Sequence, residues 1–164
     1  MITRRVILLL SMAIFACTTL SAQNFKYIGA SKCKMCHNKP DKGEQFNKWA
    51  EGPHANAMES LSAEEAKDPK CLKCHSTVGH IDASLVASIK VEEGVSCESC
   101  HGPGSMYKGA SVMKNQELSI QKGLILPEEQ VCKKCHNEES PDFKGFDYAE
   151  YAAKIAHPNP KAAN

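Results

Sequence analysis

The chain repeats one short pattern four times: two cysteines three positions apart, with a histidine directly after the second. The four copies read SKCKMCHNK at 31–39, KCLKCHST at 70–77, SCESCHGPG at 96–104 and VCKKCHNEE at 131–139. On a helical turn, positions i, i+3 and i+4 project from one face, so each copy would present two thiols and an imidazole together. Any fold for this sequence must therefore accommodate four such sites.

Several chemistries use cysteines at this spacing. The pairs could form local disulfides, combine two by two into zinc sites with four thiolate ligands, or hold iron–sulfur clusters. None of these requires a histidine after the second cysteine, and the 164 residues include only seven histidines. C-x-x-C-H is the attachment motif of c-type haem. The repeated pattern therefore predicts a protein that carries four haem c groups.

Each part of the motif has its own predicted role. The two thiols form thioether bonds to the vinyl groups of one haem, and the histidine binds its iron as the proximal ligand. The predicted attachment residues are Cys33, Cys36, Cys71, Cys74, Cys97, Cys100, Cys132 and Cys135. The predicted proximal ligands are His37, His75, His101 and His136.

Composition agrees with an interior filled by cofactor. Only 6% of the residues are aromatic and 42% are hydrophobic, a little below the 45–50% that is usual. Four porphyrins would supply apolar surface that the side chains lack. Residues 23–164 are too few to enclose each haem separately, so the haems should lie close together. We expect one compact tetrahaem cytochrome c domain at 23–164, mainly α-helical with extensive irregular loop.

The first 22 residues have the layout of a secretory signal peptide. Arg4 and Arg5 precede an apolar run from Val6 to Cys17 that is too short to span a membrane. Cleavage after Ala22 would give a periplasmic protein whose eight cysteines all lie in the four motifs. The alternative is a lipoprotein signal with Cys17 lipidated, and this lipid would then be the membrane contact.

Local signals predict short helices between the motifs. A helix that contains Phe46 and Trp49 should end at Gly52, and a shorter helical piece is expected over 55–61. Ser62 and Glu65 form a plausible capping box. The lead-in at 26–30 should be extended, and 80–94 is ambiguous between helix and strand.

The second half of the chain should contain three helices. One is expected over 111–123, closed by Gly123. Another should begin at Pro127 and carry the fourth motif. The last should be capped by Asp147 and stop at Pro158.

The second axial ligands of the irons must come from outside the motifs. His54 and His157 are the favoured candidates, and His80 is the third. His80 is only five residues from His75, so it is better placed to serve a neighbouring haem. Three histidines cannot complete four irons, which leaves one haem to a methionine, another donor or no ligand. Met113 is the methionine assigned to this role, and the other candidates are Met35, Met58 and Met106.

Longer stretches around the motifs resemble a known family. YIGASKCKMCHNK at 27–39, FNKWAEGPHANAM at 46–58 and GVSCESCHGPGS at 94–105 resemble the tetrahaem cytochromes of the cytochrome c-554 superfamily. The tail at 132–158 is similar to a small periplasmic branch of it. The resemblance implies a mostly helical protein with four covalent haems in stacked pairs. It also implies that His54 and His157 are ligands.

The chain departs from the family at one place. Many relatives have a histidine shortly after the CHGPG segment, where this sequence has Met106 and Tyr107. A ligand found in those relatives is therefore missing, and the resemblance permits one five-coordinate haem.

These observations together predict a periplasmic electron carrier rather than an enzyme. It would pass single electrons through four haems between a donor and an acceptor protein. The alternative is a small reductase that acts at an open haem on a nitrogen oxide, hydroxylamine or peroxide. The formal charge of +1 includes Arg4 and Arg5 and falls to −1 without residues 1–22, so nucleic acid is not an expected partner.

Overall fold

The computed structural model describes residues 25–160. The predicted signal segment, with Cys17, lies outside the described residues. Within 25–160 the regular structure is helical, apart from an isolated parallel bridge between Tyr27 and Val86. The α-helices are α2 (Ala30–His37), α3 (Gln45–Ala50), α4 (Pro69–His75), α5 (Cys97–His101), α6 (Ala110–Met113), α7 (Gln116–Gln121), α8 (Glu129–Cys132) and α9 (Tyr148–Ile155).

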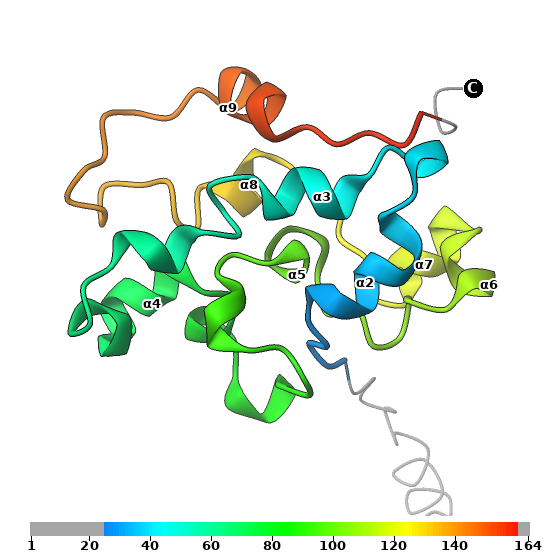
Figure 1. The fold of residues 1–164 in the computed structure, drawn as a ribbon, viewed down its shortest axis with the longest axis horizontal. Helices are drawn as coiled ribbons and strands as arrows, with labels where there is room; N and C mark the ends of the chain where they lie inside the picture. The colour runs from blue at the N-terminus through cyan, green and yellow to red at the C-terminus, as the bar shows by residue number, and fades with distance from the viewer. Residues whose placement is uncertain (1–24, 161–164) are drawn as a thin grey trace, which may run out of the picture.

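Short 3-10 turns and irregular loops connect these helices. The turns are η1 (Pro40–Lys42), η2 (Ala57–Ser60), η3 (Glu65–Lys67), η4 (Thr77–His80), η5 (Ala83–Leu85) and η6 (Val91–Glu93). In Figure 1, α4 lies at one end of the molecule, α6 and α7 lie at the other, and α5 lies between them. The segment with α9 runs along the side of the molecule where α8 and α3 lie. The prediction of a mainly helical fold with much loop is confirmed.

The protein interior contains little apolar side chain. Among the described residues, the buried hydrophobic side chains are Ile28, Ala30, Ile89 and Tyr107. The buried polar ones are Ser76, Thr77, Ser96, Glu98 and Ser119. A domain of this size normally buries many large aliphatic side chains, so the polypeptide alone supplies only a thin core.

Several local predictions are confirmed. The helix with Phe46 and Trp49 is α3, and the indole nitrogen of Trp49 donates to the Val95 carbonyl at 2.9 Å. Ser62 and Glu65 form the expected reciprocal capping box, with bonds of 2.8 and 3.2 Å, ahead of η3. The Asp147 side chain caps α9 by accepting from the Glu150 amide at 2.9 Å. The ambiguous segment 80–94 consists of short 3-10 turns and the bridge residue Val86.

Two helix predictions are wrong. The expected helix over 111–123 is divided into α6 and α7, because the Asn115 side chain accepts from the Leu118 amide at 2.9 Å and starts a new helix. The helix expected from Pro127 begins instead at Glu129 and ends at Cys132. Cys135 and His136 therefore follow α8 in a turn.

Candidate functional site

The four motif copies lie on or directly after short helices. The first copy ends α2, the second ends α4, and the third makes up α5. In the second copy, Asp68 caps α4 by accepting from the Lys70 amide at 2.9 Å, and Pro69 occupies the first helical position. The fourth copy starts on α8 and finishes in the turn after it. The first three motifs thus have the helical turn that their spacing predicted, and side-chain caps support it in α4 and α5.

Thiols from different copies approach one another. The Cys33 thiol is hydrogen bonded to Cys97, and this contact lowers the pKa of Cys33 and raises that of Cys97. Cys135 is hydrogen bonded to Cys74, and burial together with Cys74 raises the pKa of Cys135 to about 12. The first copy therefore pairs with the third, and the second pairs with the fourth.

A further contact connects the two pairs. Burial raises the pKa of the Cys100 thiol, and the nearby Cys132 thiol raises it further. Cys100 belongs to the third copy and Cys132 to the fourth. The thiol contacts link the four copies in the order first, third, fourth, second, and Thr77 of the second copy also contacts Ser96 and Ser99 of the third, at 2.8 and 2.6 Å.

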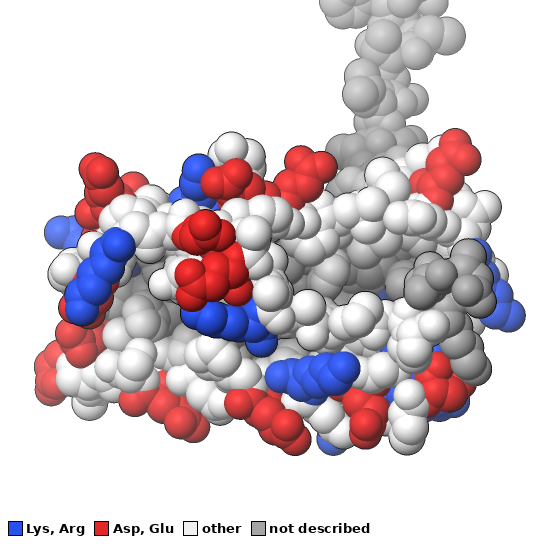
Figure 2. Space-filling model, turned by 90° about the horizontal axis from the view of Figure 1, so that it is seen from above, with Lys and Arg blue, Asp and Glu red and all other residues white. Residues whose placement is uncertain are grey.

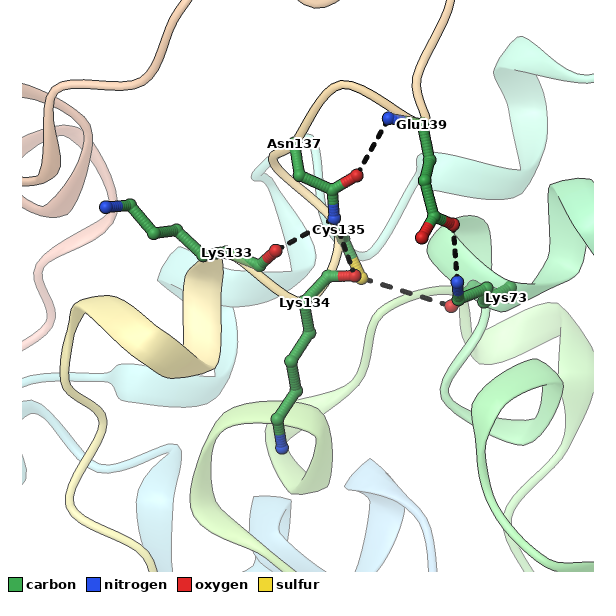
Figure 3. A network of polar contacts seen from close by, with 6 residues as sticks. All are labelled: Lys73, Lys133, Lys134, Cys135, Asn137 and Glu139. Carbon is green, nitrogen blue, oxygen red and sulfur yellow. Dashed lines mark hydrogen bonds and ion pairs between the residues drawn. The ribbon is translucent and has the colours of Figure 1, made fainter.

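The junction between the second and fourth copies lies at the surface (Figure 3). Lys73 makes a 2.5 Å ion pair with Glu139, and both side chains are largely exposed. The Cys135 thiol lies 3.9 Å from the Lys73 carbonyl oxygen. The Asn137 amide donates to the carbonyls of Lys133 and Lys134 at 2.9 and 3.2 Å. These contacts fold the turn after the fourth copy onto α4.

Two motif histidines each face a histidine from outside the motifs. The ring centroids of His54 and His136 are 6.0 Å apart, with the ring planes at 69°. Those of His101 and His157 are 6.1 Å apart, at 80°. With metal–nitrogen bonds of about 2 Å, two imidazoles on opposite sides of one ion have centroids about 6 Å apart. Both pairs therefore leave the space that one ion needs.

Backbone carbonyls orient several of these rings. The Nδ1 atoms of His75, His101 and His157 lie 2.8, 3.3 and 2.8 Å from the carbonyl oxygens of Ala57, Ile125 and Ile155. Nδ1 must carry the hydrogen to donate to a carbonyl, which leaves the Nε2 lone pair free to bind a metal. Burial also lowers the pKa of the buried ligand candidates and so favours the neutral ring. These candidates are His37, His54, His101 and His136.

The structure places the two other candidate ligands differently. The Nδ1 atom of His80 is 3.2 Å from the Ser76 carbonyl oxygen, so the ring stays close to the end of α4. Met113 ends α6, at the opposite end of the molecule from α4 (Figure 1). Met113 is therefore not placed to complete an iron bound by His75.

Tyr107 occupies the place where relatives have a histidine, and its hydroxyl is engaged by the backbone. It donates to the carbonyls of His101 and Gly102 at 3.0 and 2.9 Å. Burial raises the pKa of the phenol, with a further contribution from Cys33. Tyr107 thus acts as a packing residue that supports the third copy.

Sequence reasoning missed one residue of the site, Glu98. This side chain lies between the two cysteines of the third copy, is only 1% exposed, and accepts hydrogen bonds from backbone amides. The available signal was an acid directly after the first cysteine, where the other copies have Lys or Leu.

The donor set fits haem c better than its rivals. All eight motif cysteines are free thiols, and the contacts between copies join Cys33 to Cys97, Cys74 to Cys135 and Cys100 to Cys132. Over residues 25–160, no three or more His, Cys, Asp or Glu side chains are grouped to hold a metal ion. The thin core and a pocket of about 310 Å³ beside His136 leave space for apolar groups. A flat apolar cofactor with iron at its centre would use both the space and the paired imidazoles.

None of the helices in the described part of the chain is long and apolar enough to cross a membrane.

Comparisons with known proteins agree with this arrangement. The family model for cytochrome c554 and c-prime matches residues 32–102, which include the first three motif copies. The cytochrome c-554 of Nitrosomonas europaea is 29% identical over 154 residues, covering 76% of this chain and 63% of the relative's own length. No solved structure matches the chain. By its motifs, its paired histidines and these matches, the chain is similar to cytochrome c-554 proteins, and the family match covers its first three motif copies.

Proposed function

We propose that the chain is a periplasmic electron-transfer protein that carries four covalent haem c groups. The observation that carries the proposal is the pair of histidine arrangements, with centroids 6.0 and 6.1 Å apart, each joining a motif histidine to one from outside the motifs. Such pairs are the axial ligands that an electron carrier needs, since the iron keeps both ligands in its two oxidation states.

The proposal gives each site residue a role. The eight motif cysteines anchor the haems, and His37, His75, His101 and His136 are the proximal ligands. His157 completes the site of His101, and His54 completes the site of His136. When bound, the haem iron supplies one-electron exchange between its ferric and ferrous states.

The protein fixes the ligands before and after that exchange. The Ile125 and Ile155 carbonyls hold His101 and His157 through Nδ1, which leaves Nε2 available. A ligand held in this way does not have to reorient when the charge on the site changes. The same logic applies to His75, which is held by the Ala57 carbonyl.

The arrangement of the copies supports an electron-transfer route with an entry site and an exit site. In the order that the thiol contacts give, the first and last sites are those of α2 and α4. Redox partner proteins are expected to dock at these ends. Figure 2 shows acidic and basic side chains interspersed on one face, and a mixed surface of this kind supports a protein partner rather than nucleic acid.

A second function deserves testing because the chain has seven histidines for eight axial positions. His37 and His75 lack an assigned partner, and His80 or Met113 can complete only part of this need. At least one haem then lacks a second histidine. Such a site would suit a small reductase acting on a nitrogen oxide, hydroxylamine or peroxide.

Haem counting tests the main proposal. Pyridine haemochrome analysis and intact mass of the secreted protein should give four covalent haems and a chain that begins after residue 22. Fewer than four haems would contradict the tetrahaem function. Carbon monoxide binding then separates the two functions, because a protein with four fully ligated low-spin haems would not bind it and would not be a reductase.

A further inference from the structure

We infer that Glu98 is a positioning residue that fixes a negative charge between the first and third motif copies. The charge makes the haems of these two copies harder to reduce than those of the second and fourth. The inference rests on the proposed function, because it concerns the relative potentials of four haem sites.

Glu98 joins the two copies through backbone amides. Its Oε2 accepts from the Ile28 and Gly29 amides at 2.9 and 2.7 Å, and its Oε1 accepts from Ile28 and Gly104 at 3.0 and 2.6 Å. Ile28 and Gly29 immediately precede α2, which carries the first copy. Glu98 itself lies on α5, which carries the third. A single side chain thus holds the two copies together.

Two glycines allow this close approach. Gly29 has φ of +86°, a conformation that other residues rarely adopt. A Cβ added at Gly104 would lie 3.1 Å from Glu98 Oε1 and 3.1 Å from Ile28 Cδ1. The backbone is therefore shaped around the carboxylate, which indicates that the carboxylate is a built part of the site.

The contacts of Glu98 select its ionised form. Both oxygens accept from N–H donors, and all the hydrogen bonds that Glu98 makes through its side chain are of this kind. A protonated carboxyl would need an acceptor for its own hydrogen. Burial raises the pKa of Glu98, and the three backbone amides oppose that rise.

No cation neutralises this charge within the described part of the chain. The three ion pairs there are Lys73–Glu139, Lys133–Glu129 and Lys154–Glu150, all at exposed positions. The charged neighbour that affects Glu98 is another acid, Glu93, which accepts from the Ala30 amide at 2.7 Å. Two carboxylates therefore stand at the start of α2.

A buried charge distinguishes the first and third copies, because the charged side chains inside the other motifs are exposed lysines. Lys34 lies inside the first motif, Lys73 lies inside the second, and Lys133 and Lys134 lie inside the fourth. These side chains are exposed, so water and salt screen them, whereas the buried Glu98 is screened much less. A nearby negative charge favours ferric over ferrous iron, so the first and third sites should have the lower reduction potentials.

Two substitutions at Glu98 separate charge from geometry. Glu98→Gln keeps the size of the side chain and removes its charge, whereas Glu98→Asp keeps the charge and shortens the side chain. Glu139→Gln removes an exposed acid at the other end and is the matched control. Haem content is measured first. Reduction potentials then follow from spectroelectrochemical titration, with the haems assigned by paramagnetic NMR.

The expected result is specific to two haems. In Glu98→Gln, the ratio of reduced to oxidised iron at the first and third sites should rise about tenfold at a fixed potential, a positive shift of about 59 mV. Glu98→Asp should shift them much less, although hydrogen exchange at Ile28 and Gly29 becomes faster in both variants. Glu139→Gln should leave all four potentials nearly unchanged.

Other results would overturn the inference without touching the proposed function. Four haems with unchanged potentials in Glu98→Gln would do so, as would equal shifts in the Gln and Asp variants. If Glu98→Gln does not acquire its haems, the fixed-charge role is tested with Glu93→Gln instead. A positive shift at the same two haems supports the fixed-charge role, and no shift overturns it. A wild-type protein with fewer than four haems would instead contradict the proposed function.

Discussion

The first and third motif copies are joined through buried contacts, whereas the second and fourth are joined at the surface. In the first pair, Glu98 accepts hydrogen bonds from amides about 70 residues away and is 1% exposed. In the second pair, the main polar link is the ion pair of Lys73 and Glu139, whose side chains are 47% and 66% exposed. The same motif is therefore held by two different kinds of interaction.

The difference has an energetic meaning. Removal of one partner from a buried hydrogen-bonded group leaves the other partners unsatisfied, and each unsatisfied group costs about 1–3 kcal/mol. An exposed ion pair between flexible side chains contributes little to stability. The half of the molecule with the first and third copies should therefore be the more rigid half.

The largest expected effect comes from removing a whole attachment site in each half. A Cys97→Ala/Cys100→Ala variant should lose one haem by mass spectrometry and should melt at a lower temperature than a Cys71→Ala/Cys74→Ala variant. The reason is that the third copy contacts all three other copies, whereas the second contacts only the third and the fourth. Equal melting temperatures for the two variants would contradict the expected difference in stability between the two halves.

Loss of an axial histidine should change one haem in each half. His157→Ala removes the partner of His101, and His54→Ala removes the partner of His136. Each variant should convert one haem from low spin to high spin in electron paramagnetic resonance spectra, while the haem count stays at four. His80→Ala provides the comparison, and spectra unchanged from wild type in both His157→Ala and His54→Ala would refute the pairing.

Truncation of Glu98 should destabilise the protein more than truncation of Glu139. Glu98→Ala leaves three buried amides without an acceptor and should lower the free energy of unfolding by about 3 kcal/mol. Glu139→Ala removes an exposed partner and should give no measurable change. Denaturant unfolding of both variants, monitored by circular dichroism, checks this. Similar destabilisation by the two substitutions would show that the halves are equally robust.

A smaller effect is expected at the C-terminal helix. Asp147 caps α9, which precedes His157, so Asp147→Ala should cost about 1 kcal/mol of stability. Asp147→Asn keeps an acceptor at this position and should recover most of the loss in thermal unfolding. No recovery in the Asn variant would indicate that the aspartate acts through its charge instead.

Short-range features of this protein were predictable from sequence, and long-range ones were not. The motif spacing gave the helical turns of α2, α4 and α5, and the Ser62–Glu65 box and the Asp147 cap were read from residues three apart. The break at Asn115 was missed because a weaker capping signal lay within an otherwise continuous helical pattern.

The pairing of copies and the role of Glu98 depend on contacts that sequence spacing does not encode. His54 and His157 were proposed from motif and family pattern, but only the folded chain places them opposite His136 and His101. Glu98 was overlooked because the middle positions of the motif act as spacers in haem attachment. Its partners lie on a segment that precedes it by about 70 residues.

That separation along the chain sets an order for biogenesis. Synthesis proceeds from the N-terminus, so Ile28 and Gly29 are made long before the carboxylate that binds them. Until Glu98 emerges, nothing in its side chain restrains the segment ahead of Cys33. The segment ahead of the earliest thiol pair is therefore not fixed by Glu98 until the third copy has been made.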